Sequence, residues 1–176
     1  MPHFDAKGEA DAAFRELGVP TTYLLTSFYW DNFIHFGMGP SRGADGKLAI
    51  TFPLGDSKMP SIAAEDIGRC AYAIFKRPEL IGKRVGIAGE HVSGAEMAAG
   101  FSKALGEEVR YNSVDPATYR GFGFPGSDDL GNMFQFYRDF EDDFRKPRDV
   151  GFSRELNPQL QDFAAWLDAN KSAIKI

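Results

Sequence analysis

Apolar residues recur at helical spacing near the amino terminus and then give way to a short β-branched run. One face of a helix over residues 5–17 collects Ala10, Ala13, Phe14 and Leu17. A glycine and a proline end this helix, and residues 21–27 have the composition of a buried strand. A helix that leads into such a strand is half of a parallel crossover unit. Its partner strand should lie upstream of residue 1, so the chain is expected to begin within a fold.

Further along the chain, strand and helix patterns alternate. Strands are predicted at residues 47–52, 84–88 and 109–114, helices at 63–76, 93–105, 128–140 and 157–170, a short helix opening at 115, and loops at 37–43 and 53–60. The helix at residue 93 has the clearest start, because Ser93 and Glu96 form a capping box. This alternation favours an α/β fold with parallel strands.

One glycine pattern matches the G-x-G-x-x-G fingerprint of dinucleotide-binding turns, at Gly121, Gly123 and Gly126. That fingerprint needs a strand directly before it and a helix start beneath the pyrophosphate. Here a short helix precedes the glycines, and Pro125 removes one backbone donor. An ordinary tight loop is the better interpretation, so the chain is expected to lack a phosphate-binding glycine loop.

Tyr72 and Lys76 form a second pattern, which could indicate a catalytic pair. The Y-x-x-x-K spacing places a phenol and an ammonium on one helical face, as proton transfer in short-chain dehydrogenases requires. Tyr72, however, stands among alanines and Ile74 in a helix whose pattern indicates core packing. The same spacing is also common by chance, so we interpret the pair as structural.

Composition narrows the class of protein. The hydrophobic share of 43% is enough for a packed core, and the net charge of −5 argues against nucleic-acid binding. No apolar run is long enough to span a membrane. Cys70, the one cysteine, suits a reducing compartment and is expected to be a packed thiol. The three histidines lack metal-ligand spacing. We expect a cytoplasmic protein without direct nucleic-acid, membrane or metal contacts.

An ordered series of short segments resembles the NmrA-like family, a group of atypical short-chain dehydrogenases/reductases, and in particular its NADPH-sensor branch. The segments lie at residues 3–9, 18–22, 28–32, 54–56, 64–68, 93–105, 123–126 and 132–134, and the likeness ends near residue 167. The resemblance thus covers nearly the whole chain. It implies the carboxyl-terminal part of an NAD(P)-binding Rossmann-like fold, with a helical lobe on the substrate side. By the same resemblance, residues 1–176 are one NmrA-like domain without its amino-terminal glycine-loop half.

The resemblance also implies a cofactor site. Lys7 corresponds to the lysine that contacts the nicotinamide ribose of NADP(H), and the segment Tyr29, Trp30, Asp31 and Asn32 would line the nicotinamide end. Ligands of such sheets bind off the carboxyl ends of strands, which fits a segment that follows the first predicted strand. The catalytic tyrosine of ordinary short-chain dehydrogenases stands four residues before the lysine, where this chain has His3.

Three functions remain open on this sequence. The leading interpretation is a non-catalytic regulator that senses NADP(H), with no catalytic residue assigned. The second is an atypical NADPH-dependent reductase with His3 or Tyr29 as proton donor. The third is a cofactor-free interaction module. Without the glycine-loop half, the sheet face and edge around residues 23–26 would be exposed, so we expect self-association or a covering protein partner.

Overall fold

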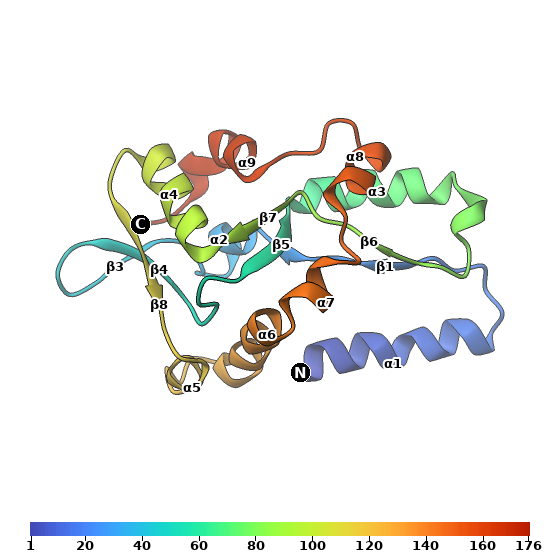
Figure 1. Cartoon of the computed structure of the whole chain (residues 1–176), viewed down its shortest axis with the longest axis horizontal. Helices are drawn as coiled ribbons and strands as arrows, with labels where there is room; N and C mark the ends of the chain where they lie inside the picture. The colour runs from blue at the N-terminus through green and yellow to red at the C-terminus, as the bar shows by residue number, and fades with distance from the viewer.

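Two short parallel strands run side by side in the right half of Figure 1 and separate toward the centre of the molecule; we call this pair the stem of a fork. They are β1 (Tyr23–Leu25) and β6 (Arg84–Gly86). Beyond the stem, β5 (Lys58–Ile62) enters between the continuations of the two strands, β2 (Phe28–Tyr29) and β7 (Glu90–Ser93). β5 is parallel to β2 and antiparallel to β7. The stem leaves one edge of β1 without a strand partner.

The computed structural model describes residues 1–176 and contains a second sheet, whose edge strand β3 (Ser41–Arg42) is exposed. That sheet pairs β4 (Leu48–Phe52) with β3 and β8 (Val109–Ser113). The α-helices are α1 (Pro2–Glu16), α2 (Asn32–His35), α3 (Ala64–Phe75), α4 (Gly94–Leu105), α5 (Pro116–Arg120), α6 (Ser127–Asp139), α7 (Glu141–Arg145), α8 (Val150–Leu156) and α9 (Phe163–Asn170), and the 3-10 helices are η1 (Pro78–Leu80) and η2 (Lys171–Ala173). None of these helices has the length and apolar character needed to cross a bilayer. The α/β fold with parallel strands is therefore confirmed.

An aromatic core lies where the fork meets the second sheet. Phe33 is at its centre, with ring centroids 5.0 Å from Phe101 and 6.0 Å from Phe163. A smaller apolar cluster lies around the stem, where Cys70 and Ile74 of α3 pack with Val85 of β6. Burial raises the pKa of the Cys70 thiol to about 11, so the expected packed thiol is confirmed.

At α4 and α5, capping signals in the sequence predicted the helix starts correctly. Ser93 and Glu96 form the capping box, since the Glu96 amide donates to Ser93 Oγ and the Ser93 amide donates to Glu96 Oε2. Asp115 accepts from the Ala117 amide at the start of α5. These ends depend on neighbours in the sequence, which is why one sequence suffices to predict them.

Several expectations are wrong where tertiary contacts outweigh local pattern. Residues 53–60 are not only a loop, because β5 begins at Lys58 and includes Pro60, and β7 was not expected at all. The last helix starts at Phe163 with Asp162 as its cap. Asn157 Oδ1 accepts from the Gln159 amide, but only a turn follows, and Asn157 Nδ2 donates to the buried Asp66. The first helix begins at Pro2, a proline that its first turn tolerates.

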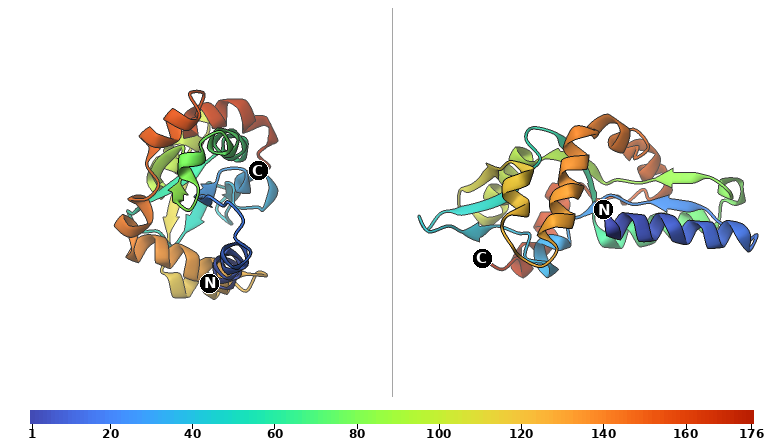
Figure 2. Two further views of the ribbon diagram at one scale, coloured as in Figure 1. Left: turned by 90° about the vertical axis from the view of Figure 1, so that its right-hand side faces the viewer. Right: turned by 90° about the horizontal axis from the view of Figure 1, so that it is seen from below.

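Helix α1 also departs from expectation, because it buries none of its residues. The apolar face predicted for it is largely open to solvent, with Phe14 47% and Leu17 77% exposed. In the two further views of Figure 2, α1 lies beside the strands rather than within the body of the molecule. Its first three turns border the cavity described below.

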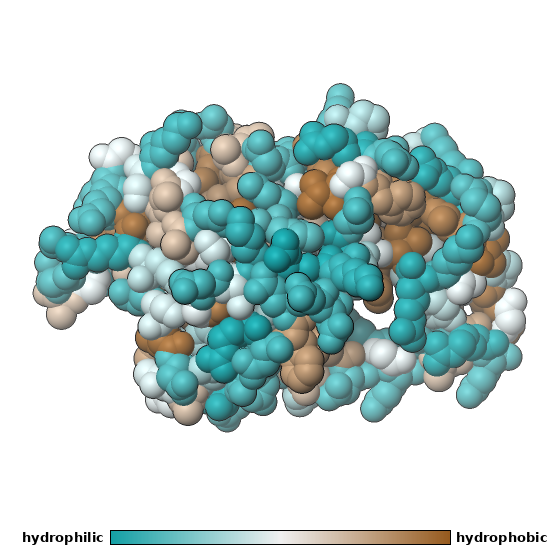
Figure 3. All heavy atoms as spheres, in the orientation of Figure 1, coloured by the Kyte–Doolittle hydropathy of each residue, from teal (hydrophilic) through white to brown (hydrophobic).

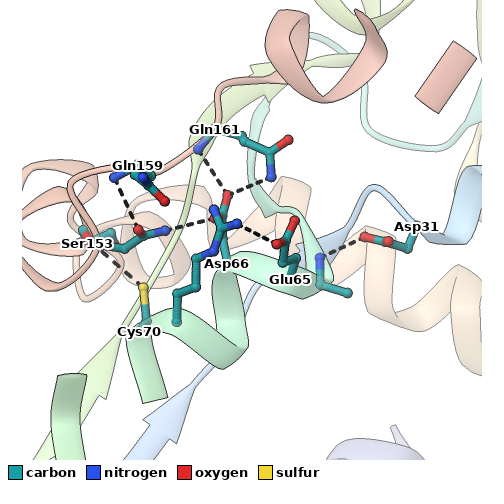
Figure 4. A network of polar contacts seen from close by, with 10 residues as sticks. Asp31, Glu65, Asp66, Cys70, Ser153, Gln159 and Gln161 are labelled. Atoms are coloured by element: carbon teal, nitrogen blue, oxygen red, sulfur yellow. Dashed lines mark hydrogen bonds and ion pairs between the residues drawn. The ribbon is translucent and has the colours of Figure 1, made fainter. Parts of the chain in front are cut away.

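A buried carboxylate ties α3 to the segment before α9 (Figure 4). Asp66 is fully buried, and its Oδ1 accepts from Asn157 Nδ2 at 2.8 Å. Its Oδ2 accepts from the backbone amide of Gln161 at 3.0 Å and from the Gln161 side chain. Arg69, one turn along α3, adds an ion pair to Oδ1. This network fixes the extended segment between α8 and α9 against the fork.

Replacing Asp66 by Ala should lower the free energy of unfolding by about 3 kcal/mol, because buried donors of Asn157 and Gln161 lose their acceptor. The matched control is Glu65→Ala, which removes an exposed partner of Arg69 and should change stability by less than about 1 kcal/mol. Urea unfolding of both variants measures the difference. Equal effects would show that the buried network contributes no more than the surface pair.

Candidate functional site

A cavity of about 650 Å³ lies between α1, the β1–β2 segment and α6. The surface is visibly hollowed above α1 in Figure 3. The β1–β2 segment lines it along its whole length, residues 23–29, and α6 contributes Leu130, Met133 and Tyr137. From α1 come His3, Phe4, Lys7, Gly8 and Asp11. Most of these side chains are apolar or aromatic, as in sites for flat organic ligands.

The first turns of α1 anchor it at one end of the cavity. The ring of His3 is hydrogen bonded through Nδ1 to Oδ2 of Asp129 in the first turn of α6. The Phe4 ring lies 6.3 Å from the Tyr137 ring, centroid to centroid. At the far end of the helix, Arg15 lies over the Tyr23 ring at 5.8 Å. The cavity is therefore closed by a helix that is held mainly at its two ends.

Three of the five residues expected at a cofactor site line this cavity. Lys7 lies one turn after His3 on the α1 wall, while Tyr29 and Asn32 lie on the β2–α2 side. The phenol of Tyr29 is hydrogen bonded to Thr26 Oγ1 at 3.0 Å. The cofactor role of these residues remains a prediction.

Trp30 and Asp31 do not line the cavity. Trp30 is fully buried and packs on the other side of the segment, 5.5 Å from Phe163 and 6.2 Å from Trp166. Asp31 accepts a 2.7 Å hydrogen bond from the Ala64 amide, at the start of α3. Strand β2 ends at Tyr29, and α2 begins at Asn32 with Asp31 as its cap residue. The chain turns between the two elements, so four neighbouring residues divide between the core and the cavity.

Arg148 lines the cavity although no sequence pattern indicated it. Its Nε donates to the Thr26 carbonyl at 2.8 Å and its Nη1 to the Phe144 carbonyl at 2.8 Å. The guanidinium also lies 3.7 Å from the centroid of the Phe144 ring. The contact with Thr26 spans 122 positions in the sequence. Local periodicity carries no signal for such a pair, which is why it was missed.

The glycine pattern at residues 121–126 and the Tyr72–Lys76 pair both lie away from the cavity. The Gly121–Gly126 stretch is a turn between α5 and α6, as expected, with positive φ at Gly123 and Gly126. Tyr72 is 65% exposed, so its expected core packing is wrong. Its ring lies 3.9 Å from Lys76 Nζ on the outer face of α3, and the neighbouring Lys76 ammonium lowers the pKa of the phenol. Within the chain, no three His, Cys, Asp or Glu side chains are grouped to hold a metal ion.

Replacing Asp129 by Asn should loosen α1, because the amide makes a weaker hydrogen bond to His3 than the carboxylate does. Amide hydrogen exchange of residues 2–16 should accelerate about fivefold, the equivalent of about 1 kcal/mol. Asp128→Asn is the matched control, since Asp128 is the exposed neighbour in the same turn. Unchanged exchange in the Asp129 variant would mean that the His3 contact does not hold the helix.

The chain is similar over almost all of its length to known proteins. The NmrA-like family matches residues 1–167. Among relatives, the chain is 28% identical over 125 residues to an NAD(P)H azoreductase of Xenophilus azovorans, covering 68% of this chain and 42% of that protein. It is 29% identical over 119 residues to the nitrogen metabolite repression protein nmr of Neurospora crassa. That match covers 63% of this chain and 24% of that protein.

The fold of the chain is also similar to that of solved structures. The structure of NmrA, a negative transcriptional regulator, in complex with NADP matches with a TM-score of 0.65 at 24% identity, over 90% of this chain and 54% of that one. The chain thus spans about half of that structure and less than half of the two relatives. With a family match over residues 1–167 and this shared fold, the chain belongs to the NmrA-like family.

Proposed function

We propose that this chain forms the nicotinamide-side and ligand-side part of a regulator that responds to NADP(H). The observation that carries the proposal is the cavity wall, on which Lys7 and His3 lie one helical turn apart and face the side bearing Tyr29 and Asn32. A regulator of the same family, NmrA, has been solved with NADP. A nitrogen metabolite repression protein is among the relatives.

The residues of the cavity fit the nicotinamide end of such a cofactor. A flat ring suits the aromatic lining, and the amide of Asn32 offers both a donor and an acceptor to a carboxamide. The Lys7 ammonium would donate to ribose hydroxyls, the role that the family resemblance implies for it. When bound, the nicotinamide supplies a hydride donor or acceptor. The chain's own residues bind it, orient it and keep water from one face.

Regulation is favoured over reduction by the groups that stand near Lys7. Four residues before it the chain has His3, whose ring is already engaged by Asp129. The nearest phenol in the segment opposite, Tyr29, is hydrogen bonded to Thr26. Neither arrangement supplies the phenol-and-lysine pair on one helix that the dehydrogenase mechanism uses.

An NADPH-dependent reductase is the second candidate, and the His3–Asp129 pair is what favours it. A carboxylate that holds one ring nitrogen of a histidine orients the other nitrogen, an arrangement suited to proton donation. The azoreductase relative adds weight to this alternative. A third candidate, a cofactor-free interaction module, is favoured by the open edge of β1.

Lys7→Ala should weaken NADPH binding about tenfold, because it removes one charge-assisted hydrogen bond. Calorimetric titration of this chain with NADPH measures the affinity. Lys103→Ala is the control, since Lys103 is an exposed residue of α4 outside the cavity. Absence of NADPH binding by the unmodified chain would leave only the interaction module.

Absorbance at the NADPH band separates the first two candidates once binding is established. A regulator should leave the absorbance constant in the presence of azo dyes, the substrate class that the name of the azoreductase relative suggests. A steady, substrate-dependent loss of absorbance that disappears in His3→Phe would identify a reductase instead. Phe keeps the ring volume and its contact with Phe4 but removes the nitrogen atoms.

Self-association should be visible in sedimentation velocity at micromolar concentration, because β1 presents unpaired backbone groups along one edge. Leu24→Lys places a charge on that strand and should shift the distribution toward the monomer, while the fold of α4 and the second sheet is kept. A monodisperse monomer for the unmodified chain would contradict the proposed use of this edge.

A further inference from the structure

Arg148 is a buried cation without an anionic partner. Only 9% of the residue is exposed, and none of the ion pairs of the chain includes it. Burial lowers its pKa to about 10, so the guanidinium remains charged near neutral pH. Buried charges are normally paired, because taking an ion out of water is costly. Two carbonyls and one aromatic ring offset part of that cost here, which leaves room for an anion.

The backbone holds Arg148 against the fork. Gly86, the last residue of β6, has no space for a side chain, because a Cβ there would lie 2.0 Å from the Pro147 carbonyl oxygen and 3.1 Å from Arg148 Cγ. The chain at 147–148 therefore packs directly on the end of β6. From this position Arg148 Nε reaches the Thr26 carbonyl, just beyond β1. No hydrogen bond in the structure uses Nη2, so the planar fork of the guanidinium has donors to spare.

A second polar group of the cavity lining has no hydrogen-bond partner, and it follows directly on the Thr26 carbonyl that Arg148 binds. Ser27, the residue after Thr26, is 8% exposed, and its Oγ has no hydrogen bond. A buried hydroxyl without a partner costs free energy, so each such group in a native structure calls for an explanation. Ser27 and Arg148 both line the cavity. Together they offer a hydroxyl donor and a guanidinium to the same space.

The remainder of the cavity sets the kind of molecule that would carry the anion. Its charged lining consists of the cations Lys7 and Arg148 and one carboxylate, Asp11, with His3 held by Asp129. Phe28, Tyr29 and Tyr137 belong to the aromatic lining of the same cavity. A flat apolar ligand therefore suits the aromatic lining, and a single anionic group on that ligand suits the end of the cavity that Arg148 lines.

We propose that Arg148 and Ser27 form an anion subsite that selects, for this cavity, flat apolar ligands bearing one carboxylate or sulfonate group. The inference rests on the proposed function in one respect, that the cavity is a ligand site. It adds the chemical class of the ligand and the two residues that recognise it. The guanidinium donates two parallel N–H groups to such an anion, and the Ser27 hydroxyl donates a third hydrogen bond.

The test compares two probes of the same shape, 2-naphthoate and 2-naphthamide, by calorimetric titration of the full chain. The structure predicts that naphthoate binds at least tenfold more tightly than naphthamide, because only the carboxylate compensates the buried guanidinium. Equal affinities for the two probes would overturn the proposal.

Two variants locate the preference. Ser27→Ala removes a hydroxyl that has no partner, so the free energy of unfolding should not fall, while naphthoate affinity should drop about fivefold with naphthamide unchanged. Arg148→Gln should abolish the preference altogether, and Arg154→Gln, on the exposed face of α8, is its charge-matched control. If Arg148→Gln fails to fold, Ser27→Ala still decides. A naphthoate preference that survives in Ser27→Ala at full strength counts against the subsite.

Failure of this inference is distinguishable from failure of the proposed function. NADPH binding with no naphthoate preference would leave the cofactor role and remove the anion subsite. A naphthoate preference that depends on Arg148 and Ser27, without NADPH binding, would keep the subsite and remove the cofactor role.

Discussion

Strands β1 and β6 run side by side for three residues and must then separate, because β5 enters between their continuations. A separating pair leaves backbone groups without ladder partners, and these must be satisfied in another way. Arg148 does so for the Thr26 carbonyl, with a side chain that arrives from a distant part of the sequence. The same divergence turns Trp30 into the aromatic core and leaves Tyr29 on the cavity side. The separation of the two strands thus places the aromatic core on one side of the β1–β2 segment and the cavity on the other.

The polar network of Asp66 stabilises the diverging strands on the side away from the cavity. Asp66 accepts from Asn157 and Gln161 and so fixes the segment that leads into α9. From there Phe163 and Trp166 of α9 pack on Trp30. Hydrophobic burial supplies the bulk of the stability. The buried carboxylate determines which part of the chain is placed over the fork, since its geometry accepts only donors in the right positions.

The sequence predicted features that depend on near neighbours and missed those that depend on distant ones. The α4 cap and the α/β alternation come from residues within a few positions of each other, so they could be predicted. Strand β5 contains Pro60, a residue that argues against a strand when its partners are unknown. At the site, Lys7 was found through a resemblance to a family. Arg148 and the His3–Asp129 contact join positions that only the fold brings together.

Cys70 has a consequence for how any response to the cellular redox state would have to operate. It is the only cysteine of the chain, it is fully buried, and its thiol stays protonated at neutral pH. Oxidants react with exposed thiolates, so this sulfur is protected from disulfide exchange and from sulfenic acid formation while the chain is folded. Under the function proposed above, the signal is the ratio of two ligands that differ by a hydride and not the oxidation of Cys70. Such a signal reverses as fast as the ligands exchange and needs no reductase to repair the protein.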